Sequence, residues 1–318
     1  MKITIVMAVY EPNILWLREQ LLSIETQTYR NIEVLAIDDA SPSVPHAQIS
    51  ETFAACLQNT AYRLTRNAVN IGSNRVFGLL TQDASGDVIS YCDQDDIWMP
   101  EKTERLLKAL LETGASLVYS DLRVMDAEGR VTADSLLRVR RRLSHQQGND
   151  LTKTLLFRNF TNGTAMMVPS AIAKGSLPFV TDMFADHWLT LYASTKGDIT
   201  FVPVPLVDYR LHGNNQSAVM AGVQNKQDYL KIRIKPGISR FEQYKTRLSH
   251  IPSLTETIED GFRWFLAREQ WFKNRTNARE VWRYRHFGKH AALFELTAVC
   301  LPESVFMALV WLIRREVI

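Results

Sequence analysis

Segments typical of strands and of helices alternate along the first third of the chain, and this order restricts the folds open to it. Apolar, β-branched runs predict the strands, and apolar residues at helical spacing predict the helices between them. The predicted strands cover residues 2–9, 32–37, 62–64 and 88–92, and the predicted helices cover residues 14–24, 47–57 and 76–82. This alternation predicts an α/β fold with a mostly parallel central sheet flanked by helices.

Acidic residues follow two of these strands at the point where each strand ends. Asp38 and Asp39 come after the second strand, and Asp93, Asp95 and Asp96 come after the fourth. Parallel open sheets bind ligands at the carboxyl ends of their strands, so we expect both groups to face one crevice. Three like charges within four residues favour a bound cation, and a hard divalent ion shared with phosphate is the usual solution. Helix capping and turn formation are the alternative explanation for aspartates at these positions.

The composition is that of a globular protein and excludes some kinds of partner. The chain has 318 residues, 46% of them hydrophobic and 22% charged, which allows one large or two modest domains. A net charge of +3 gives no general attraction to nucleic acid, so no nucleic-acid partner is expected. The three cysteines, at positions 56, 92 and 300, are widely spaced without a CxxC pair. They fit a reducing compartment, and with no secretory signal at the start we expect a cytoplasmic location.

The second half of the chain changes in character. Further strands are predicted at 116–120, 164–168 and 200–204, with a hairpin over 123–131, a helix over 183–192 and a mobile basic loop over 137–148. From about residue 227 the spacing is helical and rich in Arg, Trp and Phe. We therefore predict an α/β domain over residues 1–222 and a helical region over residues 223–318.

Two common phosphate-binding patterns are missing. The turn after the first predicted strand contains no glycine, so the GxGxxG pattern is absent there, and no GxxxxGK[ST] pattern occurs. A bound nucleotide would therefore be held by carboxylates and a cation rather than by a glycine-rich helix start.

An ordered set of short stretches carries a family resemblance. The set comprises Val6-Met7-Ala8-Val9-Tyr10 with Pro12, Ile37-Asp38-Asp39-Ala40-Ser41, Asn70-x-Gly72-x-Asn74 and Asp93-Gln94-Asp95-Asp96. Shorter matches follow at Asn162-Gly163-Thr164, Asp186-His187-Trp188 and Tyr209-Arg210-Leu211-His212-Gly213-Asn214-Asn215. On these stretches the chain resembles the family 2 glycosyltransferases, which are inverting enzymes with the GT-A fold.

The resemblance implies a site for a nucleotide-diphosphate sugar donor. The residues implied to bind the nucleotide are Ala8, Val9, Tyr10, Asp38, Asp39, Asn70, Asn74 and Asp93. Among these, Asp39 is implied to hydrogen-bond a pyrimidine base. Helix capping remains the alternative for the aspartates, and turn chemistry the alternative for the asparagines.

The resemblance also implies a divalent ion and a general base. Asp95 and His212 are implied to bind Mn²⁺ or Mg²⁺, which neutralises charge on the departing diphosphate. Asp186 matches the family's base, although Ala185 stands where relatives carry a glutamate. The residues implied to line the donor and acceptor pockets are Asp96, Trp98, Gly163, Thr164 and His187. For Trp98 a core position is the alternative, and for His187 a packed imidazole.

The acceptor implied by the resemblance is a bacterial surface glycan on a lipid carrier. The Cys92-to-Trp98 stretch is similar to that of rhamnosyltransferases, so dTDP-rhamnose is the first donor hypothesis and a UDP-hexose the second. Two other classes stay open, namely a catalytically silent glycan-binding or scaffold subunit and a nucleotidyltransferase. A nucleotidyltransferase normally has a glycine-rich basic loop near its first strand, and this chain has none there.

The apolar stretch over residues 291–313 raises the question of a membrane. Glu295, Pro302 and Glu303 interrupt it, so we do not expect a spanning helix. Two short amphipathic helices are expected instead. They lie in a membrane interface in one hypothesis, and in the other they pack on the first domain or form a homo-oligomer.

Overall fold

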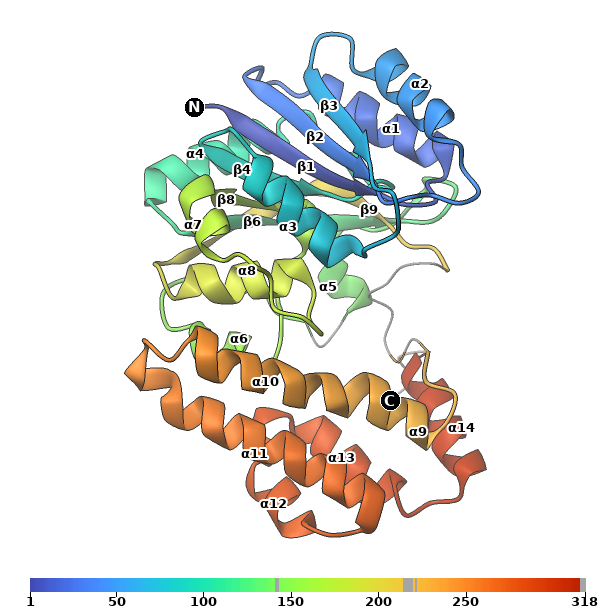
Figure 1. The fold of residues 1–318 in the computed structure, drawn as a ribbon, viewed down its shortest axis with the longest axis vertical. Helices are drawn as coiled ribbons and strands as arrows, with labels where there is room; N and C mark the ends of the chain where they lie inside the picture. Colours follow the sequence, from blue (N-terminus) through green and yellow to red (C-terminus); the bar gives the residue numbers. More distant parts are fainter. Residues whose placement is uncertain (141–142, 214–219, 221, 315–318) are drawn as a thin grey trace. The chain divides into compact units, whose positions relative to one another are not determined.

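A computed structural model of the chain describes residues 1–140, 143–213, 220 and 222–314 (Figure 1). The chain forms two compact units, the first made of Met1–Phe179 and Phe184–His212, the second of Val180–Met183 and Gly213–Ile318. The predicted division between residues 222 and 223 falls beside residues 214–219 and 221, which lie outside the described residues. That division stays a prediction.

One sheet forms the centre of the first unit, in the order β3-β2-β1-β4-β8-β6-β9-β5, with β7 paired to β6. The strands are β1 (Ile3–Val9), β2 (Ile32–Asp38), β3 (Ala61–Arg66), β4 (Val88–Cys92), β5 (Ile97–Trp98), β6 (Leu117–Met125), β7 (Val131–Ala133), β8 (Met166–Pro169) and β9 (Ile199–Arg210). Parallel pairing joins β1 to β2 and β4, β2 to β3, and β6 to β9. The shorter antiparallel pairings involve β8, β7 and β5. The prediction of a mostly parallel sheet is confirmed.

Helices cover this sheet. They are α1 (Ile14–Glu25), α2 (His46–Cys56), α3 (Ser73–Asp83), α4 (Lys102–Thr113), α5 (Leu136–Val139), α6 (Thr152–Leu155), α7 (Ser170–Gly175) and α8 (Ala185–Ser194), with a short 3₁₀ turn, η1 (Gly163–Ala165). Figure 1 shows α1 and α2 together on one face and α3 on the other. The side chain of Asn13 caps α1, accepting from Leu15 N at 3.0 Å, so the helix starts next to the end of β1.

The core of the first unit follows from the apolar strands. Ile3, Ile5 and Met7 of β1 are fully buried and pack in one cluster with Leu17 and Leu21 of α1. Full burial of such side chains contributes about 1.5–3 kcal/mol each. The packed core therefore fixes the ends of the strands, and the loops that follow these ends carry the polar residues.

From residue 222 to residue 314, the regular elements of the second unit are all helical. They are α9 (Lys226–Tyr229), a π-helical turn η2 (Leu230–Ile234), α10 (Lys235–Arg247), α11 (Pro252–Asn274), α12 (Ala278–Arg283), a 3₁₀ turn η3 (Arg285–Phe287), α13 (Lys289–Ala298) and α14 (Glu303–Arg314). Between α10 and α11, Gly261 leaves space for Phe241, because a Cβ there would lie 2.1 Å from the ring. The predicted C-terminal helical extension is confirmed. Across the described ranges, no helix combines the length and the apolar character that crossing a bilayer requires.

Two segments differ from the prediction. Strand β9 runs on to Arg210, well beyond the predicted end at residue 204. The basic segment predicted to be a loop from residue 137 contains α5, whose Ser135 cap accepts from Leu137 N at 3.2 Å. Residues 141 and 142 of that segment lie outside the described residues, so its predicted mobility stays a prediction.

Candidate active site

The ends of three neighbouring strands bring the acidic residues to one edge of the sheet. Strand β1 lies between β2 and β4, and all three run parallel. Asp39 N donates to Val9 O at 2.8 Å just beyond the strand ends. The side-chain amide of Gln94 joins the backbone of Tyr10 by two hydrogen bonds, of 2.9 and 3.0 Å. Asp39 and the loop of residues 93–96, which we call the carboxylate loop, therefore flank the end of β1.

Asp38 closes the turn after β2. Its Oδ1 accepts from Ser41 N at 3.0 Å, and its Oδ2 accepts from Arg66 Nη1 at 2.8 Å and lies 3.0 Å from His46 Nδ1. The side chain is fully buried. These contacts make Asp38 a structural support for its neighbour.

Asp39 organises the loop before α3. Its carboxylate accepts from Asn67 Nδ2 at 2.7 Å, Ile71 N at 3.0 Å and Gly72 N at 2.8 Å. Protein donors therefore surround both oxygens. Asn70 is exposed in the same loop, and Asn74 lies in the first turn of α3.

The carboxylate loop concentrates negative charge in a partly buried place. Burial raises the pKa of Asp93 above its ordinary value, and the neighbouring Asp95 and Asp186 raise it further. Burial, followed by Asp95 and Asp93, raises the pKa of Asp96 well above its ordinary range. Asp96 Oδ1 accepts from Arg210 N at 3.0 Å, and this bond and the Thr164 side chain act to lower the pKa. Within the described residues, Oδ2 is buried and has no hydrogen bond of good geometry. Such an arrangement favours a cation or a hydroxyl donor arriving with a ligand.

The residues present fit a divalent ion that phosphate would help to hold. Asp95 Oδ2 lies 2.8 Å from His212 Nε2. This is a hydrogen-bond distance, and imidazole nitrogen and carboxylate oxygen are both ligand types for divalent ions. In the described part of the chain no group of three or more His, Cys, Asp or Glu residues is arranged to hold a metal. Phosphate oxygens and water complete the shell where proteins supply only one or two ligands to Mg²⁺.

Asp186 lies at the start of α8 with its carboxylate fixed in place. Its Oδ1 accepts from His187 N at 2.6 Å and its Oδ2 from Gly163 N at 3.2 Å. Burial raises its pKa to about 6, although those hydrogen bonds and Arg140 act in the opposite direction. Because the charge of Asp186 also raises the pKa of Asp93, both carboxylates belong to one electrostatic site. A carboxylate with this pKa is mainly ionised at neutral pH and can accept a proton.

Two predicted pocket residues are packed instead. Trp98 is 2% exposed, and its Nε1 donates to Thr164 Oγ1 at 3.2 Å. Lys102 Nζ lies 3.0 Å from the centroid of the Trp98 ring, so Trp98 occupies the core position that was its alternative. The His187 Nε2 lies 2.7 Å from Leu155 O, and the side chain is buried. This favours the packed imidazole.

Several residues of the site were missed from the sequence. Gln94 and Arg210 lie inside two of the stretches that carry the family resemblance, so their position in the sequence could have indicated a role in the site. Trp16 packs its ring 4.9 Å from that of His212, and nothing in the spacing of α1 indicates this contact. Lys102 is fully buried, with Nζ 3.1 Å from Ser90 Oγ, and a lysine at the start of an amphipathic helix gives no hint of burial.

Proteins similar in sequence to this chain include glycosyltransferases. An uncharacterized glycosyltransferase of Nostoc sp. is 23% identical over 301 residues, covering 89% of this chain and 86% of that protein. The succinoglycan biosynthesis protein ExoW of Rhizobium meliloti is 30% identical over 131 residues, covering 40% of this chain and 39% of that protein.

The structure is also similar to a solved one. The crystal structure of S. aureus TarS 1-349 in complex with UDP-GlcNAc superposes with a TM-score of 0.58 at 13% identity, over 94% of this chain and 82% of that chain. At this identity the likeness shows the fold, and the predicted GT-A fold is confirmed. The family model described as glycosyl transferase family 2 matches residues 4–173, more than half of the sequence. The chain belongs to glycosyl transferase family 2.

Proposed function

We propose that the protein is an inverting glycosyltransferase that transfers a sugar from a nucleotide-diphosphate sugar to a hydroxyl of a bacterial surface glycan. The observation that carries this proposal is the link between Asp186 and the carboxylate loop: Asp186 accepts from Gly163 N, and the next residue, Thr164, accepts from Trp98, just after the loop. One carboxylate there is basic enough to take a proton, and the Asp95–His212 pair fits a cation beside phosphate. Transfer to a hydroxyl needs both functions.

Asp186 acts as the general base in this proposal. Gly163 N and His187 N hold its two oxygens, so the lone pairs that remain are directed by the backbone. It accepts the proton of the acceptor hydroxyl while that oxygen forms a bond to the anomeric carbon. The bond from that carbon to the diphosphate breaks in the same displacement, which inverts the configuration. The leaving group departs with its electron pair as a nucleoside diphosphate.

The charge on the departing diphosphate must be stabilised. Asp95 and His212 would hold Mn²⁺ or Mg²⁺ here, which supplies positive charge to the diphosphate when bound. The buried Oδ2 of Asp96, which has no well-formed hydrogen bond within the described residues, is the candidate atom to bond a hydroxyl of the donor sugar. The nucleotide would lie along the ends of β1 and β2, near Ala8, Val9 and Tyr10. In this arrangement Asp39 contributes by holding the loop that carries Asn70.

The donor is proposed to be dTDP-rhamnose, with a UDP-hexose as the second candidate. The first rests on the form of the stretch from Cys92 to Trp98, which is similar to rhamnosyltransferases. The second is favoured by the TarS complex, which holds UDP-GlcNAc. The match to a succinoglycan biosynthesis protein supports a polysaccharide acceptor.

A panel of nucleotide sugars tests the proposal. Each donor is added with and without Mn²⁺ or Mg²⁺, and donor hydrolysis and thermal shift are measured. We expect one donor to raise the melting temperature and to be consumed, with both effects weakened in Asp95→Asn. Binding without turnover, even with acceptor glycans present, would instead indicate a silent glycan-binding subunit. Release of pyrophosphate from a nucleoside triphosphate and a sugar phosphate would indicate a nucleotidyltransferase.

We also propose that the second unit contacts the inner face of the cell membrane, where a lipid-linked acceptor is found. Residues 213–318 contain 17 Lys and Arg against 10 Asp and Glu. Helix α14 buries Phe306 and Val310 but exposes Val305, Ala308 and Trp311 at three-residue spacing. A basic composition with an exposed apolar stripe that includes a tryptophan fits an anionic lipid interface.

Vesicle flotation tests the membrane contact. Full-length protein is expected to float with vesicles containing phosphatidylglycerol and to stay unbound with phosphatidylcholine alone. Trp311→Ser should weaken flotation while circular dichroism shows the helical content unchanged, because the side chain is 49% exposed. Absence of flotation together with a dimer that Trp311→Ser dissociates would assign the stripe to a homo-oligomer instead.

A further inference from the structure

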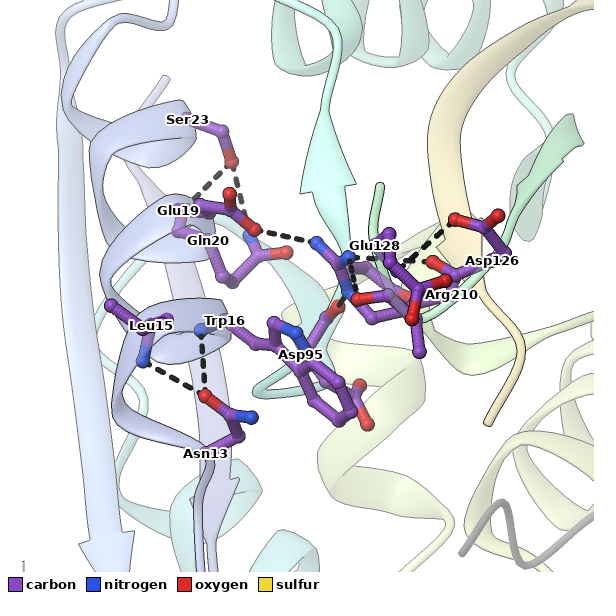
Figure 2. A network of polar contacts seen from close by, with 12 residues as sticks. Asn13, Leu15, Trp16, Glu19, Gln20, Ser23, Asp95, Asp126, Glu128 and Arg210 are labelled. Atoms are coloured by element: carbon purple, nitrogen blue, oxygen red, sulfur yellow. Dashed lines mark hydrogen bonds and ion pairs between the residues drawn. The ribbon is translucent and has the colours of Figure 1, made fainter. Parts of the chain in front are cut away.

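Arg210 is a buried cation that connects three separate segments of the first unit (Figure 2). It is the last residue of β9 and only 1% exposed. The segments around it are α1, the carboxylate loop and the turn between β6 and β7. In Figure 2 its guanidinium lies between Glu19 of α1 and Asp126 of the turn, with Asp95 nearby.

The guanidinium donates in three directions. Nε donates to Asp95 O at 2.8 Å, and Nη2 to Glu19 Oε2 at 2.6 Å. Nη1 donates to Ala127 O at 3.2 Å and more weakly to Asp126 O at 3.4 Å. In addition, the backbone N of Arg210 donates to a carboxylate oxygen of Asp96 at 3.0 Å. Arg210 is thus hydrogen-bonded to both Asp95 and Asp96 of the carboxylate loop.

A ring of contacts closes around this residue. The Arg210 guanidinium carbon lies 5.2 Å from the centroid of Trp16, whose ring lies 4.9 Å from that of His212. His212 Nε2 in turn lies 2.8 Å from Asp95 Oδ2, and the Asp95 carbonyl accepts from Arg210. Arg210 therefore restricts the two proposed metal ligands. It holds Asp95 through that residue's backbone carbonyl, and it restricts His212 through the ring of Trp16.

Only an arginine satisfies this environment. The planar guanidinium presents five donors in a fixed fork, whereas lysine offers a compact charge with three rotatable donors. Three carbonyl oxygens and a carboxylate converge here from different segments, so a lysine would leave some of them without a donor. An unmet acceptor in a buried place costs free energy, and the loop would shift to reach water.

We propose that Arg210, oriented by Glu19, is the positioning residue of this site, setting the geometry of Asp95, Asp96 and His212 before the donor binds. The proposal deepens the proposed glycosyl transfer and rests on it for the role of the site. It assigns no contact with the substrate to Arg210. Glu19 is 49% exposed in its side chain, so its effect on the carboxylate loop would pass through Arg210.

Hydrogen exchange and steady-state kinetics together test this role. The variants are Arg210→Lys and Glu19→Ala, and the matched control is Arg123→Gln. Arg123 also forms a two-bond ion pair with a carboxylate, donating from Nη2 to Asp208 Oδ2 at 2.7 Å, and lies on β6. The control therefore removes an ion pair whose side chains, in the described part of the chain, form no hydrogen bond with residues 93–96.

We expect both test variants to expose the carboxylate loop while leaving the rest of the sheet protected. In Arg210→Lys, amide exchange in a peptide covering residues 93–98 should be about tenfold faster, the factor for losing one charge-assisted hydrogen bond. The KM for the donor and the half-saturating Mn²⁺ concentration should rise by a similar factor, with the acceptor KM unchanged. Glu19→Ala should show the same pattern more weakly. Arg123→Gln should lower the melting temperature without either effect.

The two arms separate this proposal from the proposed function. Unchanged exchange at residues 93–98 in Arg210→Lys and Glu19→Ala, or an increase equal to that in Arg123→Gln, would make Arg210 a structural residue only. A wild-type protein that turns over no donor would refute the glycosyl transfer, and the exchange arm would still decide on Arg210. If Arg210→Lys does not fold, Glu19→Ala alone decides, because its side chain is half exposed.

Discussion

On the proposed role of Asp186 as general base, activity should fall as the pH drops through about 6, because the carboxyl must be ionised to accept the acceptor proton. Burial raises the pKa of this carboxyl to about 6. At pH 5 about one molecule in eleven then has the carboxylate ionised, against about ten in eleven at pH 7, so kcat/KM should fall about tenfold. An ordinary aspartate, with a pKa near 4, would leave activity almost unchanged over this range.

Removing the nearby charge of Arg140 should shift the pH at which activity is lost on the acid side of the profile, which we call the acid limb. Arg140 lowers the pKa of Asp186, so Arg140→Gln should raise that pKa and shift the acid limb to higher pH. Arg138→Gln is the matched control, since Arg138 is not among the groups that shift Asp186. The measurement is kcat/KM for the acceptor between pH 4.5 and 8 with saturating donor. A flat profile between pH 5 and 7, or an equal shift in both variants, would refute the assignment.

The same carboxylate should reduce stability while it supports activity. Its pKa is raised in the folded chain, so the ionised form costs free energy at neutral pH, up to about 3 kcal/mol, and this cost disappears as the pH falls below 6. Asp186→Asn should therefore lower kcat by about 10²–10⁴ while the melting temperature at pH 7.5 stays equal or rises. A fall in both would mean that Asp186 serves the fold instead.

Three further changes should have distinct effects. Asp95→Asn should weaken donor binding most when Mn²⁺ is present, measured by calorimetry with and without the ion; equal weakening in both conditions would contradict a metal role. Burial lowers the pKa of Lys102 to about 7, so stability should rise between pH 7 and pH 8.5 by up to about 1.4 kcal/mol per pH unit, and Lys102→Met should remove this slope in denaturant titrations. Gly261→Ala should destabilise the chain by about 1–3 kcal/mol, because its Cβ would meet Phe241, and an unchanged melting curve would argue against the close helix packing.

Local patterns predicted the first half of the sheet well. Strand β4 covers residues 88–92 as expected, because a short β-branched run ends sharply at the aspartates. Strand β9 was predicted too short, since Pro203 and Pro205 interrupt its pattern and each removes a backbone donor. The structure accommodates the prolines where the pairing with β6 shifts register around Asp121. This adjustment involves a partner strand distant in sequence, and no local signal indicates it.

The candidate site divides in the same way. The crevice could be predicted, because the carboxyl ends of parallel strands meet at one edge and the aspartates follow those ends. The contacts of Arg210 could not, because Glu19 and Arg210 are 191 residues apart. Trp98 and His187 were predicted to line the pocket, and in the structure both are buried. The sequence does not show which face of a helix or strand other elements cover.

The way in which Asp39 is held has a consequence for engineering the donor preference. Three protein donors already satisfy its carboxylate, and two of them are main-chain amides of the loop before α3. A change of this one side chain would release the loop rather than simply alter a contact. Changing the nucleobase preference should therefore require replacing residues 67–72 and Asp39 together with the matching residues of another enzyme.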